Sequence, residues 1–379
     1  MASETSLAEL AALFLRLGTT AFGGPAAHIA LMRDEVVRRR GWMSDERFLD
    51  LLGATNLIPG PNSTEMAIHV GWSRRRWPGL VVAGTCFILP AMLMTGALGW
   101  AYVRFGTRPE ASWLLWGVKP VILAVVVQAL WGLAPTAART WPLRVLGVAA
   151  AAAAAMGVNE LVVLLVCGLA VAAAGARRAG GGGLAQIVPA LPLAAGTTAA
   201  TAVSASGLFW VFVKIGSVLF GSGYVLLAFL RADLVSRLHW LTEGQLIDAV
   251  AAGQLTPGPV FTTATFVGYL LAGPKGALVA TAGIFLPAFV FVAASGPLVP
   301  RLRASKRAGA FLDGVNVASL ALMAVVTVEL GRAAIVDAAT AALGVAAALV
   351  LLRWKTSSTW LVLGGAALGL VAHALGLPR

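Results

Sequence analysis

Long runs of apolar residues alternate with short polar or charged stretches along most of the chain. The runs 78–103, 278–299 and 334–352 contain hardly any charged side chain. A helix needs about 20 consecutive apolar residues to cross the hydrocarbon core of a bilayer, and each of these runs is close to or above that length. The pattern predicts an all-α polytopic membrane protein, whose surroundings are the lipid bilayer.

Six helical segments are predicted in each half of the chain. In the first half they cover 8–31, 46–72, 78–103, 111–134, 142–157 and 160–175. In the second half they cover 207–230, 244–271, 274–299, 308–332, 334–352 and 358–376. The weaker run 187–206 is rich in Thr, Ala and Ser, and the sequence leaves open whether it adds one more crossing.

Composition and charge agree with the membrane assignment. Hydrophobic residues make up 59% of the chain and charged residues 12%, against about 25% charged in a soluble domain. The formal net charge is +12, but the cations gather in short loops such as 74–76 and 301–307. Loop topology and anionic headgroups account for cations at such positions, so no nucleic-acid partner is expected.

An internal repeat relates the two halves of the chain. The segment from Phe14 to Gly24 resembles the segment from Phe212 to Ser222. The same offset aligns several further positions: Trp42 with Trp240, Asp50 with Asp248, Asn56 with Gln254, and Pro59-Gly60-Pro61 with Pro257-Gly258-Pro259. Chance similarity between apolar helices rarely keeps Gly, Pro, Trp and Asp in register, so we expect two homologous six-helix repeats.

The repeats divide the chain into 1–176 and 207–379, joined by a basic, glycine-rich linker over 177–206. The richest short basic loop follows the second segment of the first half and the third segment of the second half. Placing both loops in the cytoplasm requires halves of opposite orientation. Arginines in the loop after the first segment, such as Arg38 and Arg40, oppose this arrangement.

Glycine and proline interrupt the first two segments of each half. Backbone groups left unpaired at such breaks are tolerated at membrane depth only inside the protein or beside a wet cavity. A helix that restarts after a break directs its N–H groups and its positive dipole end toward the break, which suits an anion. The predicted anion site comprises the glycines and neutral donors Gly23, Gly24, Asn56, Gly60, Asn62, Ser63, Thr64, Gly221, Ser222, Gln254, Gly258 and Thr262. Two alternatives stay open: kinks that only help packing, and hydroxyls that bond within their own helix.

Four charged or titratable residues extend the predicted site. Arg16 and Lys214 occupy equivalent positions before the two glycine-rich turns, where they could contact an anion or extend to the membrane interface. Glu65 and His69 lie four residues apart on one helix face, and could relay protons or form a local structural pair. Lys119 and Glu329 are further charges within apolar runs, and the sequence does not show their partners.

The sequence lacks the motifs of common soluble enzymes: there is no nucleotide-binding lysine loop, no HExxH and no GxSxG. Cys86 and Cys167 stand inside apolar runs without His or Asp neighbours, so no metal site is expected. We predict no cofactor and no catalytic residue.

The motifs Phe22-Gly23-Gly24-Pro25 and Asn56 to Glu65, with Phe220 to Gly223 and Thr256 to Thr262 in the second half, resemble those of the chromate ion transporter family. The resemblance is close to full length. It implies an inner-membrane protein of the long-chain, two-domain type that exports chromate, with sulfate as a similar competitor and with halves of opposite orientation. Relatives often carry a histidine after the second glycine-rich turn, where this chain has Tyr224.

The function expected from residues and resemblance together is proton-coupled export of chromate across a bacterial plasma membrane. Chromate and sulfate share shape and charge, and the residues do not show which is preferred. A transporter of another anion, an anion channel, and an intramembrane enzyme or scaffold are the alternatives. A homodimer stays open as a further arrangement.

Overall fold

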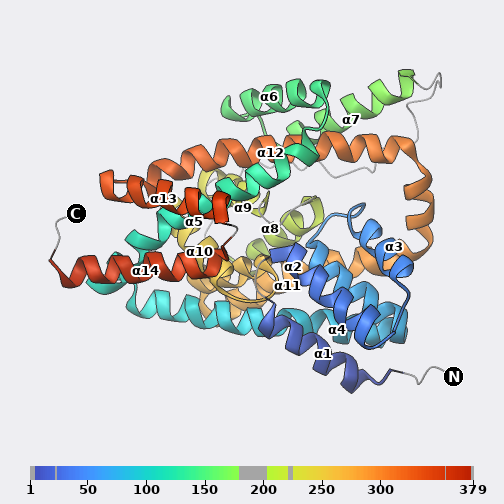
Figure 1. Ribbon diagram of the computed structural model, residues 1–379, viewed down its shortest axis with the longest axis horizontal. Helices are drawn as coiled ribbons and strands as arrows, with labels where there is room; N and C mark the ends of the chain where they lie inside the picture. The colour runs from blue at the N-terminus through green and yellow to red at the C-terminus, as the bar shows by residue number, and fades with distance from the viewer. Residues whose placement is uncertain (1–4, 22–23, 179–202, 221–224, 355, 377–379) are drawn as a thin grey trace.

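The computed structural model describes residues 5–21, 24–178, 203–220, 225–354 and 356–376, and within them every regular element is a helix (Figure 1). The first half contains α1 (Leu7–Thr20), α2 (Gly24–Arg33), the π-helix η1 (Asp34–Arg39), α3 (Asp45–Thr55), α4 (Asn62–Phe105), α5 (Pro109–Ala137), α6 (Trp141–Ala155) and α7 (Glu160–Arg178). The second contains α8 (Ala205–Val218), α9 (Leu226–Leu230), the π-helix η3 (Arg231–Arg237), α10 (Glu243–Leu255), the 3₁₀-helix η4 (Val260–Thr262), α11 (Thr263–Ala304), α12 (Lys306–Ala334), α13 (Ala338–Trp354) and α14 (Ser358–Ala374).

The order of elements in the first half returns in the second. A short helix, α1 or α8, precedes a glycine-rich stretch, and a π-helix, η1 or η3, follows it. Next comes α3 or α10, which ends before a Pro-Gly-Pro break, and a very long helix, α4 or α11, follows the break. Most of the expected linker, including nearly all of the run 187–206, lies outside the described residues.

Helix α1 shows how the local sequence sets these elements. The Ser6 hydroxyl accepts a hydrogen bond from the Glu9 amide at 3.1 Å and so caps the first turn. Leu10, Phe14 and Leu17, spaced three or four residues apart, are buried on one face of the helix. Ser204 caps α8 in the same way, through the Gly207 amide at 3.0 Å.

The long helices α4 and α11 are each folded back on themselves. Arg75 and Arg76 leave helical geometry inside α4, and Gly71 and Gly79 then meet at close range. A Cβ atom on Gly71 would lie 2.2 Å from the Gly79 carbonyl oxygen, so only glycine allows this approach. Ala272 and Gly273 interrupt α11 in the corresponding way. Each half therefore contains a tight helical hairpin directly after its Pro-Gly-Pro break.

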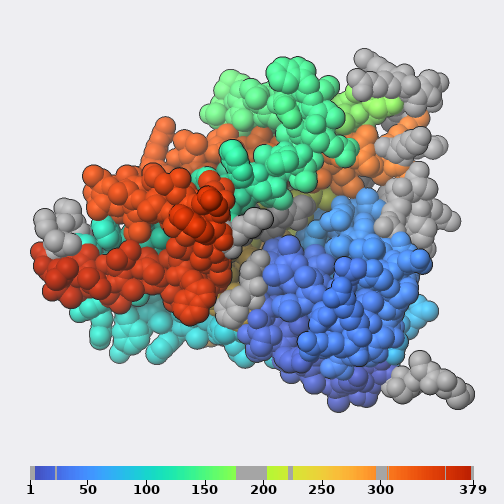
Figure 2. All heavy atoms as spheres, in the orientation of Figure 1, coloured from blue at the N-terminus to red at the C-terminus, as the bar shows by residue number. Residues whose placement is uncertain are grey.

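The two halves are intertwined rather than side by side. Helix α4 of the first half packs along α11 of the second. Helix α5 of the first half packs against α13 and α14, while α12 of the second half packs against α6 and α7. Figure 2 shows this exchange on the surface, where α6 and α7 in green rest on the orange α12. The C-terminal part of each half is thus stabilised mainly by the other half.

Among the described residues, four helices are long and apolar enough to cross a membrane: Asn62–Phe105, Pro109–Ala137, Val260–Ser295 and Arg307–Ala334. Shorter apolar helices, α6, α8, α13 and α14 among them, accompany these four. Many large apolar side chains face outward, including Trp131, Trp141, Trp210 and Trp360. An outer surface of this kind suits lipid rather than water.

Candidate functional site: two crossed helix breaks

Each Pro-Gly-Pro break contacts the end of the short helix in the other half. The Gly60 amide donates a hydrogen bond to the Leu219 carbonyl at 2.8 Å, and Leu219 is the residue that ends α8. The Gly258 amide donates to the Ala21 carbonyl at 3.0 Å, and Ala21 ends α1. The four breaks are therefore joined as two crossed pairs, and each pair combines one break from each half.

Only glycine fits the centre of either Pro-Gly-Pro break. Gly60 has φ = 141° and Gly258 has φ = 90°, which side chains rarely adopt. A Cβ atom on Gly258 would also lie 2.9 Å from the Cβ of Ala91. A Cβ atom on Gly60 would lie 2.3 Å from a carboxylate oxygen of Glu65. Glu65 thus lies directly against the break.

Glu65 is a buried acid beside the first Pro-Gly-Pro break. Its exposed fraction is 0%, and neither carboxylate oxygen has a hydrogen-bond partner among the described residues. The neighbouring Thr64 hydroxyl and the Nε2 atom of His69 are also buried and also lack a partner there. Buried polar groups usually have partners, so three unsatisfied groups near one break are unusual. The interpretation of Glu65 and His69 as a bonded structural pair is not supported.

The other neutral donors of the predicted site differ in their hydrogen-bond partners and in how far they are buried. Asn62 donates to the Asn56 side chain at 2.7 Å across the first break. The Thr262 hydroxyl donates to the Pro259 carbonyl at 2.9 Å, which is the local backbone bond expected of many such hydroxyls. Ser63 is buried and Gln254 is half-buried.

The glycine-rich turns are described only in part. Gly24 begins α2 with φ = 79°, while Gly23, Gly221 and Ser222 lie outside the described residues. The buried His28 places its Nε2 atom 3.0 Å from the Ala21 carbonyl, the oxygen that also accepts from Gly258. Since that oxygen is an acceptor, the arrangement requires His28 to donate from Nε2. His28 thereby supports one of the two crossed contacts.

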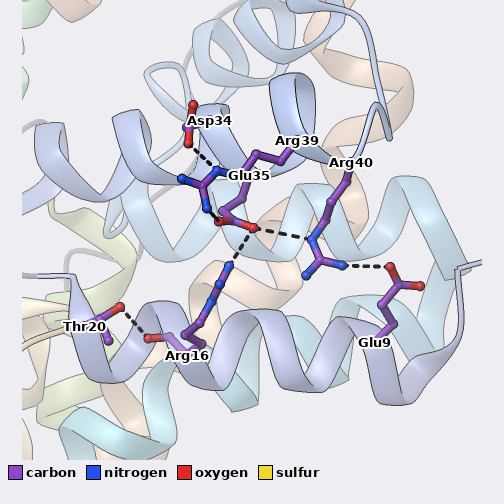
Figure 3. A network of polar contacts seen from close by, with 7 residues as sticks. All are labelled: Glu9, Arg16, Thr20, Asp34, Glu35, Arg39 and Arg40. Atoms are coloured by element: carbon purple, nitrogen blue, oxygen red, sulfur yellow. Dashed lines mark hydrogen bonds and ion pairs between the residues drawn. The ribbon is translucent and has the colours of Figure 1, made fainter.

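Both predicted cations are paired with acids. Arg16 contacts Glu35 at 2.6 Å, within the network of Figure 3. Lys214 contacts Asp233 at 2.7 Å. Glu35 and Asp233 occupy equivalent positions in η1 and η3, so the two ion pairs are equivalent as well. Within the described residues the acid partners of these two cations lie in η1 and η3 and not at a Pro-Gly-Pro break, so contact with an anion there would require an exchange of partners.

Two further ion pairs of the first half have equivalents in the second half, at the sequence offset that relates the two repeats. Arg39 contacts Glu35 at 3.1 Å, and its equivalent Arg237 contacts Asp233 at 2.7 Å. Arg33 contacts Asp45 at 2.5 Å, and the equivalent pair Arg231–Glu243 is separated by 2.7 Å. The hydrogen bond from Arg33 lowers the pKa of Asp45. The sequence prediction missed these acids, although the offset that aligns Arg16 with Lys214 also aligns Glu35 with Asp233.

The isolated charges of the apolar runs also have partners. Lys119 lies 3.4 Å from the nearly buried Asp248, whose other oxygen accepts a hydrogen bond from the Tyr102 hydroxyl at 2.9 Å. Lys119 also lines a small cavity between α5, α10 and α12. Glu329 of α12 contacts Arg231 at 2.6 Å. Both interactions join different helices, which the sequence could not show.

Comparison with known proteins identifies the family. A family model described as chromate transporter matches the chain twice, over residues 8–173 and 206–370. The chain belongs to the chromate transporter family. This membership indicates a multi-pass membrane transporter rather than an enzyme. Among the described residues, no group of three or more His, Cys, Asp or Glu side chains could hold a metal ion.

Relatives in the chromate transporter family align over most of their length. A chromate transport protein of Cupriavidus metallidurans is 34% identical over 98% of this chain and 94% of its own. A chromate transport protein of Pseudomonas aeruginosa is also 34% identical, over 86% of this chain and 82% of its own. A probable chromate transport protein of Synechococcus elongatus is 29% identical, over 92% and 90% respectively. No solved structure matches the chain.

Proposed function

We propose that this protein is a secondary transporter that exports chromate across the bacterial plasma membrane and is driven by the proton gradient. The relatives named as chromate transport proteins support chromate as the substrate. The observation that carries the proposal is the pair of crossed contacts, Gly60 with Leu219 and Gly258 with Ala21. They bring broken helices from both halves together, an arrangement that secondary transporters use for ion sites.

The helices that start at the breaks are suited to an anion. Pro61 precedes α4 and Pro259 precedes η4, and neither residue caps its helix with a side-chain hydrogen bond. Each helix start presents roughly half a unit of positive charge. Two such starts leave about one negative charge of a dianion uncompensated, so a side-chain cation is needed as well.

Lys214 is the cation that we expect to contribute most, because its equivalent Arg16 is half exposed while Lys214 is less so. Replacing Lys214 by Gln should weaken oxyanion affinity about tenfold or more, since charge beside a poorly solvated anion is lost. Replacing it by Arg should cost less, because charge is kept while geometry changes. Binding of chromate and sulfate to purified protein, measured against salt concentration, tests this.

Lys275 provides the matched control, since it is exposed in the same half and Lys275→Gln should leave affinity unchanged. Arg16→Gln and Arg16→Lys extend the test to the first half. Near-native affinity in both Lys214→Gln and Arg16→Gln would move the required charge elsewhere, with Lys119 next to examine.

We also propose that the two halves, 1–176 and 207–379, are inverted relative to each other across the linker 177–206. The loop with Thr107 and the equivalent loop with Ser305 would then lie on opposite sides of the membrane. With Cys86 and Cys167 replaced, single cysteines at Thr107 and Ser305 should differ in labelling by an impermeant thiol reagent in intact cells. Labelling of both positions from one side would disprove the inversion.

A transport assay distinguishes chromate export from its alternatives. Everted vesicles containing the protein should accumulate chromate when a proton gradient is imposed, and sulfate should compete if the site reads only shape and charge. Preference for sulfate would reassign the substrate. Uptake that neither saturates nor depends on the gradient would indicate a channel. Cross-linking in the same membranes would reveal a homodimer.

A further inference from the structure

In the second half, the carboxylate of Asp233 contacts two cations, Lys214 and Arg237. One oxygen of Asp233 lies 2.7 Å from Lys214 of α8 and 2.7 Å from Arg237 of η3. The other oxygen is buried and has no hydrogen-bond partner among the described residues. The Asp233 side chain is 1% exposed, whereas Lys214 and Arg237 are 27% and 38% exposed. An approaching anion can therefore reach both cations while the carboxylate stays inside.

The cluster contains more positive than negative charge. Lys214 and Arg237 meet one acid, Asp233, while the neighbouring Arg231 of the same π-helix contacts two acids, Glu243 and Glu329. The positive excess is therefore confined to the group of Lys214, Arg237 and Asp233. An excess charge that is partly withdrawn from water is costly unless a counter-ion is close. An anion at Lys214 and Arg237 would offset this charge.

The equivalent cluster of the first half is compensated differently. Glu35 contacts Arg16, Arg39 and Arg40, and two further acids join the same network in Figure 3: Glu9 through Arg40, and Asp34 through Arg39. The exposed Arg38 adds only a contact of 3.9 Å to Asp34. The second half has Gly207 and Ala232 where the first has Glu9 and Asp34. The second half also has Ser236 and Leu238 where the first has Arg38 and Arg40. The extra acids and the extra arginines are therefore both absent from the second cluster.

From the buried Asp233 carboxylate and the two partly exposed cations that contact it, we infer that Lys214 and Arg237 form an oxyanion-binding site in which the Asp233 carboxylate occupies the place of the anion until it arrives. Both cations contact the same carboxylate oxygen, and one oxygen of a tetrahedral oxyanion can take its place. Binding is then an exchange: the anion takes over Lys214 and Arg237, and Asp233 takes them back when the anion leaves. The inference rests on the proposed oxyanion transport and adds Asp233 and Arg237 to the site.

Neutralising Asp233 provides the test, because loss of a competitor should strengthen binding whereas loss of a purely structural ion pair should not. Asp233→Asn is expected to lower the dissociation constant for chromate and for sulfate about tenfold, since one negative charge beside the anion is removed. Transport turnover should fall, because release then lacks the returning carboxylate. Asp233→Glu keeps the charge and should bind nearly as the unaltered protein does.

Glu35→Gln is the matched control in the first half. Glu9 and Asp34 remain there, so its affinity should change much less than that of Asp233→Asn. A folded Asp233→Asn protein with unchanged or weaker affinity would overturn the inference. If the unaltered protein binds neither oxyanion, the proposed function fails instead, so the two failures are distinguishable.

A second variant covers the case in which Asp233→Asn does not fold. Arg237→Gln removes a cation that is partly exposed and leaves the Lys214–Asp233 pair in place. It is expected to raise the dissociation constant about tenfold, and Arg237→Lys should restore part of the loss because the charge returns. Unchanged affinity in a folded Arg237→Gln protein would also overturn the inference.

Discussion

Replacing Glu65 by Gln is expected to abolish chromate accumulation driven by a proton gradient while sparing anion binding. Glu65 is fully buried against the Gly60 break, and neither of its oxygens has a hydrogen-bond partner among the described residues. Burial makes the charged form of this carboxylate costly. Glu65 can therefore hold a proton while it is buried and release it when the site opens to water. Removing a proton-transfer group commonly costs about a hundredfold or more in rate, and we expect a loss of that size.

The measurement is chromate uptake by everted vesicles across a series of imposed pH gradients, together with binding to the purified protein. Glu110→Gln is the matched control, because Glu110 is an exposed acid in the first turn of α5. The control should accumulate chromate normally. A Glu65→Gln protein with unchanged pH dependence would transfer the coupling role to another group, with His69 and Glu329 the next to test.

Replacing Gly117 by Val is expected to destabilise the protein by about 3 kcal/mol, the upper part of the range for overpacking a tight contact. A Cβ atom on Gly117 would lie 2.0 Å from the Gly365 carbonyl oxygen, where α5 of the first half crosses α14 of the second. Backbone cannot move aside as a flexible side chain can. The two helices would have to separate, and the exchange between the halves would weaken at this crossing.

Gly132 lies in the same helix and has no atom within 4 Å of an added Cβ, so Gly132→Val supplies the control. Thermal unfolding of detergent-solubilised protein, followed by size-exclusion chromatography, should show a much lower midpoint for Gly117→Val than for Gly132→Val. Equal midpoints would mean that the crossing of α5 and α14 contributes little to stability.

The helix breaks at the centre of the candidate site could be predicted from motifs alone. The Pro-Gly-Pro sequences predicted helix breaks, and α3 and α4 do stop and start on either side of Gly60. The spacing of Glu65 from that break also placed it near the site. The partners of Arg16 and Lys214 were not predicted, because an ion pair depends on which helix faces which. The internal offset pointed to Glu35 and Asp233, but only as aligned acids without known neighbours.

The sequence by itself determined the helical membrane class, the order of the elements and the positions of the breaks. Those properties depend on local hydrophobicity and on glycine and proline, which act on the backbone within a few residues. Only the tertiary structure decided that the breaks are crossed between halves, through Gly60 with Leu219 and Gly258 with Ala21. It also decided that α5 packs against α13 and α14 of the second half, and that α12 packs against α6 and α7 of the first. Apolar helix faces resemble one another and can pack against many partners, so close glycine contacts and buried ion pairs, formed far apart in sequence, select the actual arrangement.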